Sequence, residues 1–299
     1  MAQSRITRAV ILAAGTGSRL AAGGDPCPKP LRKVAGKPLL GRVLRTLQSA
    51  GVREAVIVIG HQGERVQREL LELKGAGELN LQLHFVENKN YLAKNGVSLL
   101  AAEQYIDQEC FLSMADHLYS KKLVKRLAAA YLPAGACGLG VDYDIPRCFD
   151  LDDATKVRVT ATSRSSVTRI GDIAKELPSY DALDTGVFRI GPALIAELRS
   201  VFAKQGDCSL SDGVKALSQK GQFYACDVGN ARWIDVDTPS AYVEAERLLR
   251  HHGDDLSGNW LSGWDWTGIA DVVDSAVRNT VGWAIGFGPR RSYASTDAE

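Results

Sequence analysis

The stretch AVILAAGTGSRLAAGGDPCPKPLRKVAGKPLL, residues 9–40, decides the fold. It begins with Ala9-Val10-Ile11-Leu12, an apolar run without polar alternation, which is typical of a strand buried on both faces of a parallel sheet. Small residues follow directly, and they leave backbone N–H groups open to phosphate oxygens that larger side chains would keep away. We therefore predict a strand that runs into a phosphate-binding loop.

Two cations lie in the same stretch, Arg19 in the loop and Lys29 ten residues later. With the loop they predict a site for a ligand that carries several negative charges. The loop residues that we expect to contact a nucleotide are Leu12, Ala13, Ala14, Gly15 and Gly17. A tight turn without a ligand is the alternative, because paired glycines are common in turns.

The spacing of the loop excludes two common phosphate-binding motifs. A dinucleotide fold requires GxGxxG and an acidic residue after the second strand, but here the loop reads GTGSR and the second predicted strand ends in Gly60-His61. The Gly-Lys-Ser/Thr of a P-loop is also missing. The remaining pattern, LAAGxGxRL, a flexible loop, KPL and GKPLL, resembles the signature of nucleotidyltransferases that join a nucleoside triphosphate to a sugar or polyol phosphate.

The composition limits the class of protein. A chain of 299 residues with a net charge of +1 provides one large or two modest domains and argues against a nucleic-acid binder. No apolar run approaches the roughly 20 residues of a membrane helix, and no secretory segment precedes the first strand. The six cysteines form no CxxC pair, which favours free thiols in a reducing compartment. We expect a soluble, cytoplasmic protein.

Apolar strands alternate with amphipathic helices along the first half of the chain, and this order predicts an α/β fold with ligands at the carboxyl ends of the strands. The resemblance to nucleotidyltransferases implies a Rossmann-like mixed sheet flanked by helices, with a C-terminal helical tail. The expected strands cover 56–59, 81–86 and 111–114, and the expected helices 39–50, 64–74 and 97–105.

The segment ENKNYLAKNGVS, residues 87–98, follows the third expected strand. Asn95-Gly96 predicts a turn with a positive φ, and Ser98 lies in the first turn of the next helix. The plain interpretation is a loop with a helix cap. The resemblance implies instead that Asn95, Gly96 and Ser98 lie against the nucleotide.

Two acidic residues follow expected strands, and they are the candidates for a metal site. Asp116 comes directly after the strand at 111–114, and Asp235 alternates with apolar neighbours in WIDVDTP. Mg²⁺ prefers carboxylate and phosphate oxygens, so we predict Mg²⁺ on Asp116 and Asp235. Each acid could instead cap a helix or end a strand. His117 orients Asp116, touches the substrate or is structural.

Strands expected at 136–141, 157–160 and 167–170 form a cap that houses the second substrate, an acceptor. Its expected contacts are His117, Lys175, Asp184 and Thr185. The acids of DLDDATKV, residues 150–157, suggest calcium at first sight, but they lack the Gly and the final Glu of an EF-hand loop. We interpret them as a solvated turn.

Seven segments in consistent order between residues 7 and 250 resemble the cytidylyltransferases that act on inositol 1-phosphate and make CDP-inositol. They are AVILAAGTGSRL, KPLRKVAGKPLL, NGVSLLAAE, MADHLYS, DLDDATKV, YDALDTGVF and WIDVDTP. The resemblance implies a Mg²⁺-dependent reaction of CTP with a phosphate monoester. It assigns phosphate binding to Gly15, Gly17, Arg19 and Lys29 and metal binding to Asp116 and Asp235. Lys175 departs from the family pattern, in which the lysine directly follows Ile-Gly.

Residues 251–299 are expected to be a helical extension of a nucleotidyltransferase domain at 1–250. Four of the five tryptophans and an apolar helical stripe at 269–281 lie in this extension, and we expect the stripe to pack on its own domain or on a twin subunit in a homodimer. Some of the resembling transferases are fused to a membrane-embedded domain, whereas we expect no membrane span here.

The residues leave the substrates open. The acceptor could be another sugar 1-phosphate, a cyclitol phosphate, phosphocholine or a phosphonate, and the donor could be another nucleoside triphosphate. A non-catalytic nucleotide-sugar-binding protein is the alternative from another class. Arg19, Lys29, Asp116 and Asp235 together argue against it, because a binding module has no need of both carboxylates.

Overall fold

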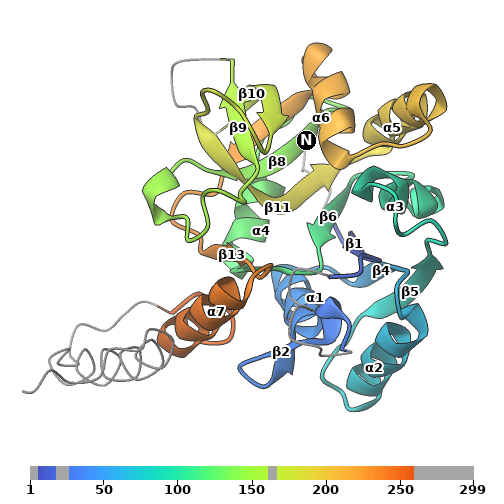
Figure 1. Cartoon of the computed structure of the whole chain (residues 1–299), viewed down its shortest axis with the longest axis vertical. Coiled ribbons are helices and arrows are strands. Elements are labelled where there is room, and N and C mark those ends of the chain that lie inside the picture. The colour runs from blue at the N-terminus through green and yellow to red at the C-terminus, as the bar shows by residue number, and fades with distance from the viewer. Residues whose placement is uncertain (1–5, 18–26, 161–166, 259–299) are drawn as a thin grey trace, which may run out of the picture. The chain divides into compact units, whose positions relative to one another are not determined.

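A nine-stranded sheet forms the centre of the molecule (Figure 1). The computed structural model describes residues 6–17, 27–160 and 167–258. The strand order is β5-β4-β1-β6-β11-β8-β12-β10-β9. The strands are β1 Arg8–Ala13, β4 Glu54–Ile59, β5 Gln82–Glu87, β6 Cys110–Met114, β8 Cys137–Asp142, β9 Lys156–Val159, β10 Val167–Ala174, β11 Ala182–Ile190 and β12 Phe223–Asp227.

Helices cover both faces of this sheet, and two short strand pairs lie beside it. The helices are α1 Leu39–Ala50, α2 Gly63–Gly75, α3 Asn95–Ala101, α4 Lys121–Ala129, α5 Pro192–Gln205, α6 Leu210–Gln219 and α7 Pro239–His252, with 3-10 turns η2 Lys29–Leu31, η3 Glu103–Tyr105 and η4 Ile145–Arg147. The short pairs are β2 Lys33–Val34 with β3 Lys37–Pro38, and β7 His117–Tyr119 with β13 Trp233–Asp235. The α/β prediction is confirmed.

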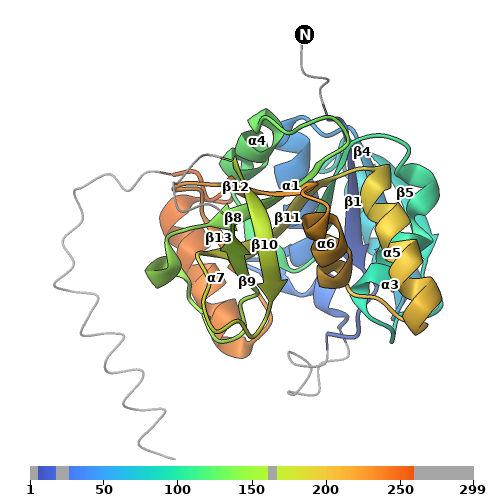
Figure 2. The same cartoon turned by 90° about the horizontal axis from the view of Figure 1, so that it is seen from above.

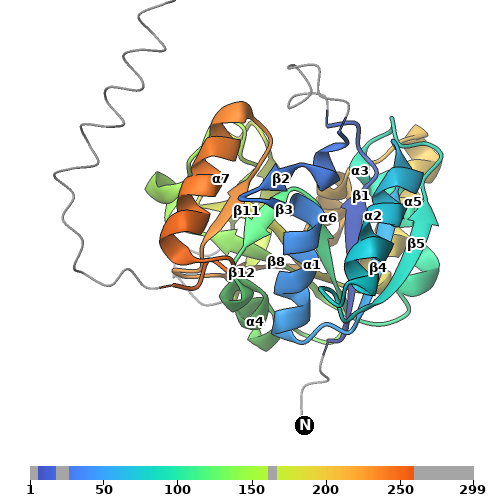
Figure 3. The same ribbon diagram turned by 90° about the horizontal axis from the view of Figure 1, so that it is seen from below.

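The four strands β5, β4, β1 and β6 are parallel, as their apolar sequences predict. Val10 of β1 pairs with Val56 on one side and Leu112 on the other. Alternate residues of β1 enter different cores. Val10 and Leu12 pack in a core to which α3, α5 and α6 contribute, whereas Ala9 and Ile11 face a core built with α1, α2 and α4. Figures 2 and 3 show these two helical layers from opposite sides.

The second half of the sheet is mixed. β11 runs antiparallel to both β6 and β8, and the strands expected at 157–160 and 167–170, β9 and β10, form an antiparallel pair. The strands expected to form a cap, at 136–141, 157–160 and 167–170, therefore continue the central sheet. The reason is that β11 bonds directly to β6 and joins the two halves into one hydrogen-bonded ladder.

The ends of individual helices test the local predictions. Gly51 ends α1 with φ of 110°, which agrees with the predicted end of this helix at residue 50, and Thr238 caps α7 by accepting a hydrogen bond from the Ala241 N–H at 3.1 Å. The predicted turn at Asn95-Gly96 is wrong. Both residues lie in the first turn of α3, after an extended Lys94. A Cβ at residue 96 would overlap the Cys208 carbonyl, so close packing between α3 and the segment before α6 requires this glycine.

The remaining predictions concern the membrane, the cysteines and the tail. Within residues 6–17, 27–160 and 167–258, no helix is both long and apolar enough to cross a membrane. All six cysteines are free thiols, as predicted. The predicted stripe and the tryptophans of residues 260–283 lie outside the described residues.

Candidate active site

The loop after β1 lines a cavity of about 230 Å³. Four of its five predicted nucleotide contacts face this cavity, namely Leu12, Ala13, Gly15 and Gly17. Ala14 is buried, and its carbonyl accepts a hydrogen bond from the His61 N–H at 3.0 Å, so this residue joins β1 to the end of β4. Arg19 lies outside the described residues.

Gly17 lies directly against the side chain of Lys29. Gly17 has φ of +63°, and a Cβ on it would overlap the Cβ of Lys29. The bare glycine thus lets the lysine side chain pass along the loop. Lys29 Nζ then lies 2.5 Å from Asp116 Oδ2 and also pairs with Asp237. Lys29 therefore holds two carboxylates together at the edge of the cavity.

Asp116 and His117 form the next part of the site, between β6 and β7. His117 Nδ1 lies 2.9 Å from Asp116 Oδ1 and 3.7 Å from Asp235 Oδ1. Burial acts to raise the pKa of Asp116, but Lys29 and His117 outweigh it and hold this pKa well below its usual range. Burial acts to lower the pKa of His117, yet Asp235 and Asp116 raise it to about 9. The two acids and the imidazolium form one charge network.

Two residues lie against the His117 ring. Its plane is within 6° of the Trp233 indole, with ring centroids 6.4 Å apart. Gly186, with φ of +73°, leaves no room for a Cβ, because that atom would overlap the imidazole. Sequence reasoning did not identify either neighbour. Both act on the ring only after β11 and β13 have come together around β7.

The strand β13 brings two acids to the same edge. It pairs antiparallel with β7, with Asp235 opposite His117. Ile234 and Val236 are buried, so Asp235 and Asp237 share the opposite face of the extended chain. Our sequence analysis assigned Asp235 and missed Asp237. The alternation in WIDVDTP is the signal that could have found it.

The acids are suited to a hard divalent cation. Ligand atoms of Asp116, His117 and Asp235 lie within 4.8 Å of one another, and so do those of Asp153, Asp235 and Asp237. Asp235 Oδ1 is buried and has no hydrogen-bond partner among the described residues. Buried oxygens are normally paired, so this atom is suited to binding a ligand. A mainly carboxylate donor set fits Mg²⁺.

Asp153 corrects one prediction. The acids of residues 150–157 were expected to form a solvated turn, but Asp150 and Asp153 line a cavity of about 430 Å³. Asp153 pairs with Lys175 and reaches the group formed with Asp235 and Asp237. The loop between β8 and β9 brings Asp153 close to Asp235 and Asp237. This contact is between residues distant in sequence, so the local sequence could not predict it.

This larger cavity shares Asp116 and Asp237 with the smaller one. Three predicted acceptor contacts, His117, Lys175 and Asp184, line it. Burial raises the pKa of Asp184 to about 6, although the Gly186 N–H, 2.7 Å from its Oδ1, and His117 act in the other direction. The two cavities therefore meet at the carboxylates that Lys29 joins.

Three predicted contacts occupy positions that serve the fold. Thr185 is fully buried, and its hydroxyl donates to the Gly140 carbonyl at 2.7 Å. Ser98 is buried and accepts from Asn88 Nδ2 at 2.9 Å. Gly96 packs against Cys208. Asn95, predicted to contact the nucleotide, lines the larger cavity, where its Oδ1 accepts from the Leu210 N–H at 2.8 Å.

The chain is similar to known nucleotidyltransferases. The sequence pattern of the family described as a MobA-like NTP transferase domain matches residues 9–148. The chain is 38% identical over 244 residues to the bifunctional IPC transferase and DIPP synthase of Rubrobacter xylanophilus, a match that covers 81% of this chain and 51% of that protein. It is 30% identical over 264 residues to the CMP-5'-(3-aminopropyl)phosphonate synthase of Streptomyces rubellomurinus, covering 80% of this chain and 38% of that protein.

The chain thus spans about half the length of the first relative and less of the second. Among solved structures, the inositol-1-phosphate CTP transferase from T. maritima is similar with a TM-score of 0.69 and 26% identity. That likeness covers 83% of this chain and 98% of the other. Residues 9–148 thus match the MobA-like NTP transferase domain, and the similarity to nucleotidyltransferases extends over about four fifths of the chain.

Proposed function

We propose that this chain transfers a cytidylyl group from CTP to inositol 1-phosphate, giving CDP-inositol and pyrophosphate. The observation that carries the proposal is the meeting of two cavities at Asp116 and Asp237. One cavity is lined by a loop of bare backbone suited to a triphosphate, and the other by a mixture of apolar and polar side chains suited to an acceptor. A transfer reaction requires such a junction, because two anions must meet at one phosphorus atom.

Two similar proteins support the choice of substrates. The T. maritima structure is that of an inositol-1-phosphate CTP transferase, and the Rubrobacter xylanophilus relative is an IPC transferase in part. The family match at residues 9–148 includes Gly15, Lys29 and Asp116. We therefore extend CTP and inositol 1-phosphate to this chain as its substrates.

We propose Asp116 and Asp235 as the residues that hold Mg²⁺, with Asp237 within reach of the same position. When bound, Mg²⁺ would supply positive charge to the triphosphate and to the departing pyrophosphate. Lys29 supplies a second positive charge at this point, and the N–H groups of the loop at Gly15 and Gly17 add oriented dipoles. Arg19 is proposed as a further phosphate contact, on sequence alone.

The chemistry then follows from charge and position. An oxygen of the acceptor phosphate attacks the α-phosphorus of CTP, a new P–O bond forms, and the bond to the β-phosphate breaks in line with it. The acceptor phosphate is already ionised at neutral pH, so we assign no general base. The protein's task is to hold both anions at Lys29 and at the carboxylate group.

The acceptor's hydroxyls have polar partners in the larger cavity. Asp184 and Lys175 line it, together with Asp150 and His117. Asp150 and Asp184 are not ion-paired with a lysine or arginine anywhere in the part of the chain that the structure describes. Such carboxylates can accept hydrogen bonds from a polyol.

The same observation favours a second candidate acceptor. Asp150, which forms no ion pair among the described residues, would also attract an ammonium group, and a relative at 30% identity is a CMP-5'-(3-aminopropyl)phosphonate synthase. An aminoalkylphosphonate is therefore the alternative substrate. It would keep the cytidylyl transfer and replace the polyol.

The test is release of pyrophosphate by the purified chain with Mg²⁺. Four nucleoside triphosphates are crossed with inositol 1-phosphate, sugar 1-phosphates, phosphocholine and aminoalkylphosphonates. Release with CTP and inositol 1-phosphate alone is the expected result. Release with another pair would keep the mechanism and replace the substrate. Folded protein that binds CTP but releases no pyrophosphate with any pair would contradict the proposal and favour a nucleotide-binding role.

A further inference from the structure

The segment that follows Lys29 is a small hairpin that depends on distant parts of the chain. We call residues 33–38, with β2, β3 and the Ala35-Gly36 turn between them, the lysine hairpin. It follows η2 directly, and the Leu39 N–H bonds to the Arg32 carbonyl at 2.9 Å and closes the segment at its base. Two strands of two residues are too short to be stable by themselves, so contacts from elsewhere must hold this hairpin.

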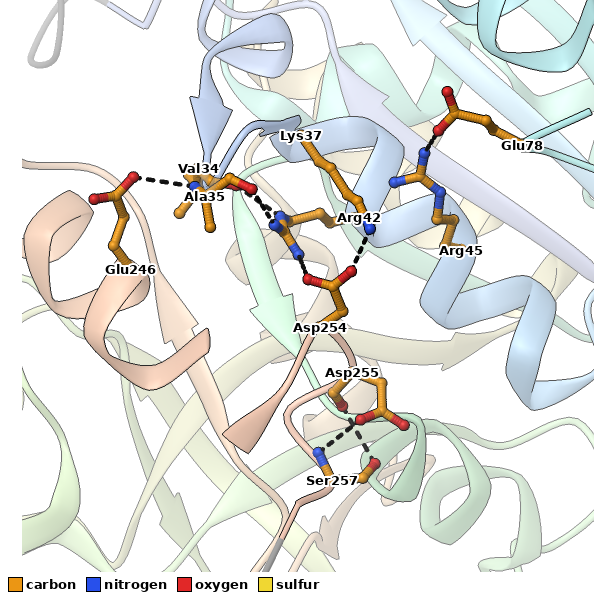
Figure 4. A network of polar contacts seen from close by, with 10 residues as sticks. All are labelled: Val34, Ala35, Lys37, Arg42, Arg45, Glu78, Glu246, Asp254, Asp255 and Ser257. Carbon is orange, nitrogen blue, oxygen red and sulfur yellow. Dashed lines mark hydrogen bonds and ion pairs between the residues drawn. The ribbon is translucent and has the colours of Figure 1, made fainter. Parts of the chain in front are cut away.

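The turn of the lysine hairpin has a backbone that local preference does not favour. Ala35 has φ of 47° and Gly36 has φ of 77°, and the first value is uncommon for a residue with a Cβ. The Ala35 N–H donates to Glu246 Oε1 of α7 at 3.0 Å. Arg42 of α1 donates from Nη2 to the Ala35 carbonyl at 3.0 Å and from Nε to the Val34 carbonyl at 2.9 Å (Figure 4). Side chains from α1 and α7 thus impose the shape of the turn.

Asp254, just after α7, completes this arrangement. Its Oδ1 accepts from Arg42 Nη1 at 3.1 Å, and its Oδ2 accepts from Lys37 (Figure 4). The Arg42 side chain is only 3% exposed, and within the described residues Asp254 is the carboxylate that forms an ion pair with it. A buried guanidinium without a counter-charge is costly, so Asp254 stabilises the conformation in which Arg42 reaches the turn.

A small apolar cluster links the lysine hairpin to the rest of the site. Val34 is fully buried against residues from β7, β13, α7 and the segment after α7; the cluster consists of Val34, Leu39, Leu118, Ile234, Val236, Ala245, Leu249 and Leu256. The strands β7 and β13 carry His117 and Asp235. Leu256 has φ of 53°, a strained value for a leucine, and it is held there in the buried cluster. Hairpin, acids and C-terminal segment therefore share one packed support.

We propose that Asp254 is a positioning residue for Lys29. Through Arg42 and Lys37 it fixes the lysine hairpin, and the hairpin fixes η2, so that Lys29 Nζ stays between Asp116 and Asp237. Asp254 lines neither cavity, and its exposed pair with Lys37 contributes little to overall stability. Its loss also leaves the buried Arg42 without a carboxylate partner, so it acts first on the lysine hairpin that Arg42 holds and through it on Lys29. The catalytic part of this inference rests on the proposed function.

The test compares Asp254→Ala with Asp255→Ala in the full chain. Asp255 is the matched control, because it lies in the same segment and accepts from the Ser257 N–H at 3.1 Å without touching the hairpin (Figure 4). Hydrogen–deuterium exchange is measured at the amides of Leu31, Arg32 and Ala35, and kcat and KM are measured with CTP and acceptor. We expect Asp254→Ala to speed exchange at all three amides and to lower kcat about tenfold, with the acceptor KM unchanged.

Asp255→Ala should change neither exchange nor kcat, and Asp254→Glu should restore most of both. Unchanged exchange at Leu31 and Arg32 in Asp254→Ala would overturn the proposal, as would faster exchange with normal kcat. An equal loss in both variants would also overturn it, since it would indicate general loosening of the C-terminal segment. If the unaltered chain releases no pyrophosphate with any substrate pair, the proposed function fails, and the exchange result still decides whether Asp254 holds the Lys29 segment.

Discussion

Lys29 is the residue on which the site's charge balance depends. Its ammonium group pairs with Asp116 and Asp237, and its side chain is only 9% exposed. Replacing Lys29 with Ala removes this charge from the junction of the two cavities, so we predict a fall in kcat/KM of about 100-fold or more. Lys33→Ala is the control, because that lysine is exposed in the same segment. Equal turnover in the two variants, measured as pyrophosphate release, would remove Lys29 from the mechanism.

A second prediction concerns Asp235 as a ligand of the metal. Its Oδ1 is buried without a hydrogen-bond partner among the described residues, so Asn can replace the side chain sterically while removing a charged ligand. We predict that Asp235→Asn raises the Mg²⁺ concentration needed for half-maximal rate by about tenfold or more. The measurement is a Mg²⁺ titration at saturating CTP. A titration curve that matches the unaltered chain would mean that Asp235 does not hold the metal.

A third prediction concerns Gly186, whose contact with His117 should affect both stability and turnover. A methyl group at this residue would overlap the imidazole, and φ of +73° disfavours any Cβ. We therefore expect Gly186→Ala to lower the free energy of unfolding by about 1–3 kcal/mol and to reduce turnover. Gly191→Ala provides the control, because Gly191 is extended and has no atom within 4 Å of an added Cβ. Denaturant unfolding of both variants measures the change in the free energy of unfolding. Similar unfolding curves would contradict the close contact between Gly186 and His117.

At the scale of elements, two capped helices with different neighbours provide a paired test. Thr238 caps α7 and directly follows Asp237, whereas Ser209 caps α6 through a reciprocal bond with Asp212. Thr238→Ala and Ser209→Ala should each cost about 1 kcal/mol of stability. We expect Thr238→Ala to reduce turnover more than Ser209→Ala, because the start of α7 supports Asp237, whereas the start of α6 lines the larger cavity. Thermal unfolding and pyrophosphate release measure the two effects, and equal turnover losses would contradict this link.

The elements also show where local sequence is informative. Apolar runs predicted β1, β4 and β6, and apolar spacing predicted α1 with both of its ends. In contrast, our sequence analysis assigned no element to α5, α6 or β12. The two helices lie on the sheet face shared with α3, and their packing partners are strands from both halves of the chain. Local periodicity was therefore informative for α1 but was not used successfully for α5 and α6.

For the whole molecule, the meeting of the two cavities predicts linkage between metal, nucleotide and stability. A ligand that binds only the folded state at about 100 times its Kd stabilises it by about 2.7 kcal/mol. We expect CTP with Mg²⁺ to raise the thermal midpoint by several degrees, and CTP with EDTA to raise it much less, because the acids at the junction repel a triphosphate without metal. EDTA alone should leave the midpoint nearly unchanged, since Lys29 already pairs with Asp116 and Asp237. Equal shifts with and without metal would contradict the proposed site.

The sequence by itself determined the parallel half of the sheet, the position of the glycine loop after β1 and the strand-end acids Asp116 and Asp235. These features depend on neighbours in the chain: a run of apolar residues, bare glycines, and an acid next to a strand end. Only the tertiary structure decided that Asp153 and Asp237 join these acids, that Thr185 and Ser98 are buried, and that Asp254 reaches the lysine hairpin. Those facts depend on contacts between residues that are distant in sequence, and such contacts arise when strand pairing brings the separate segments to one edge of the sheet.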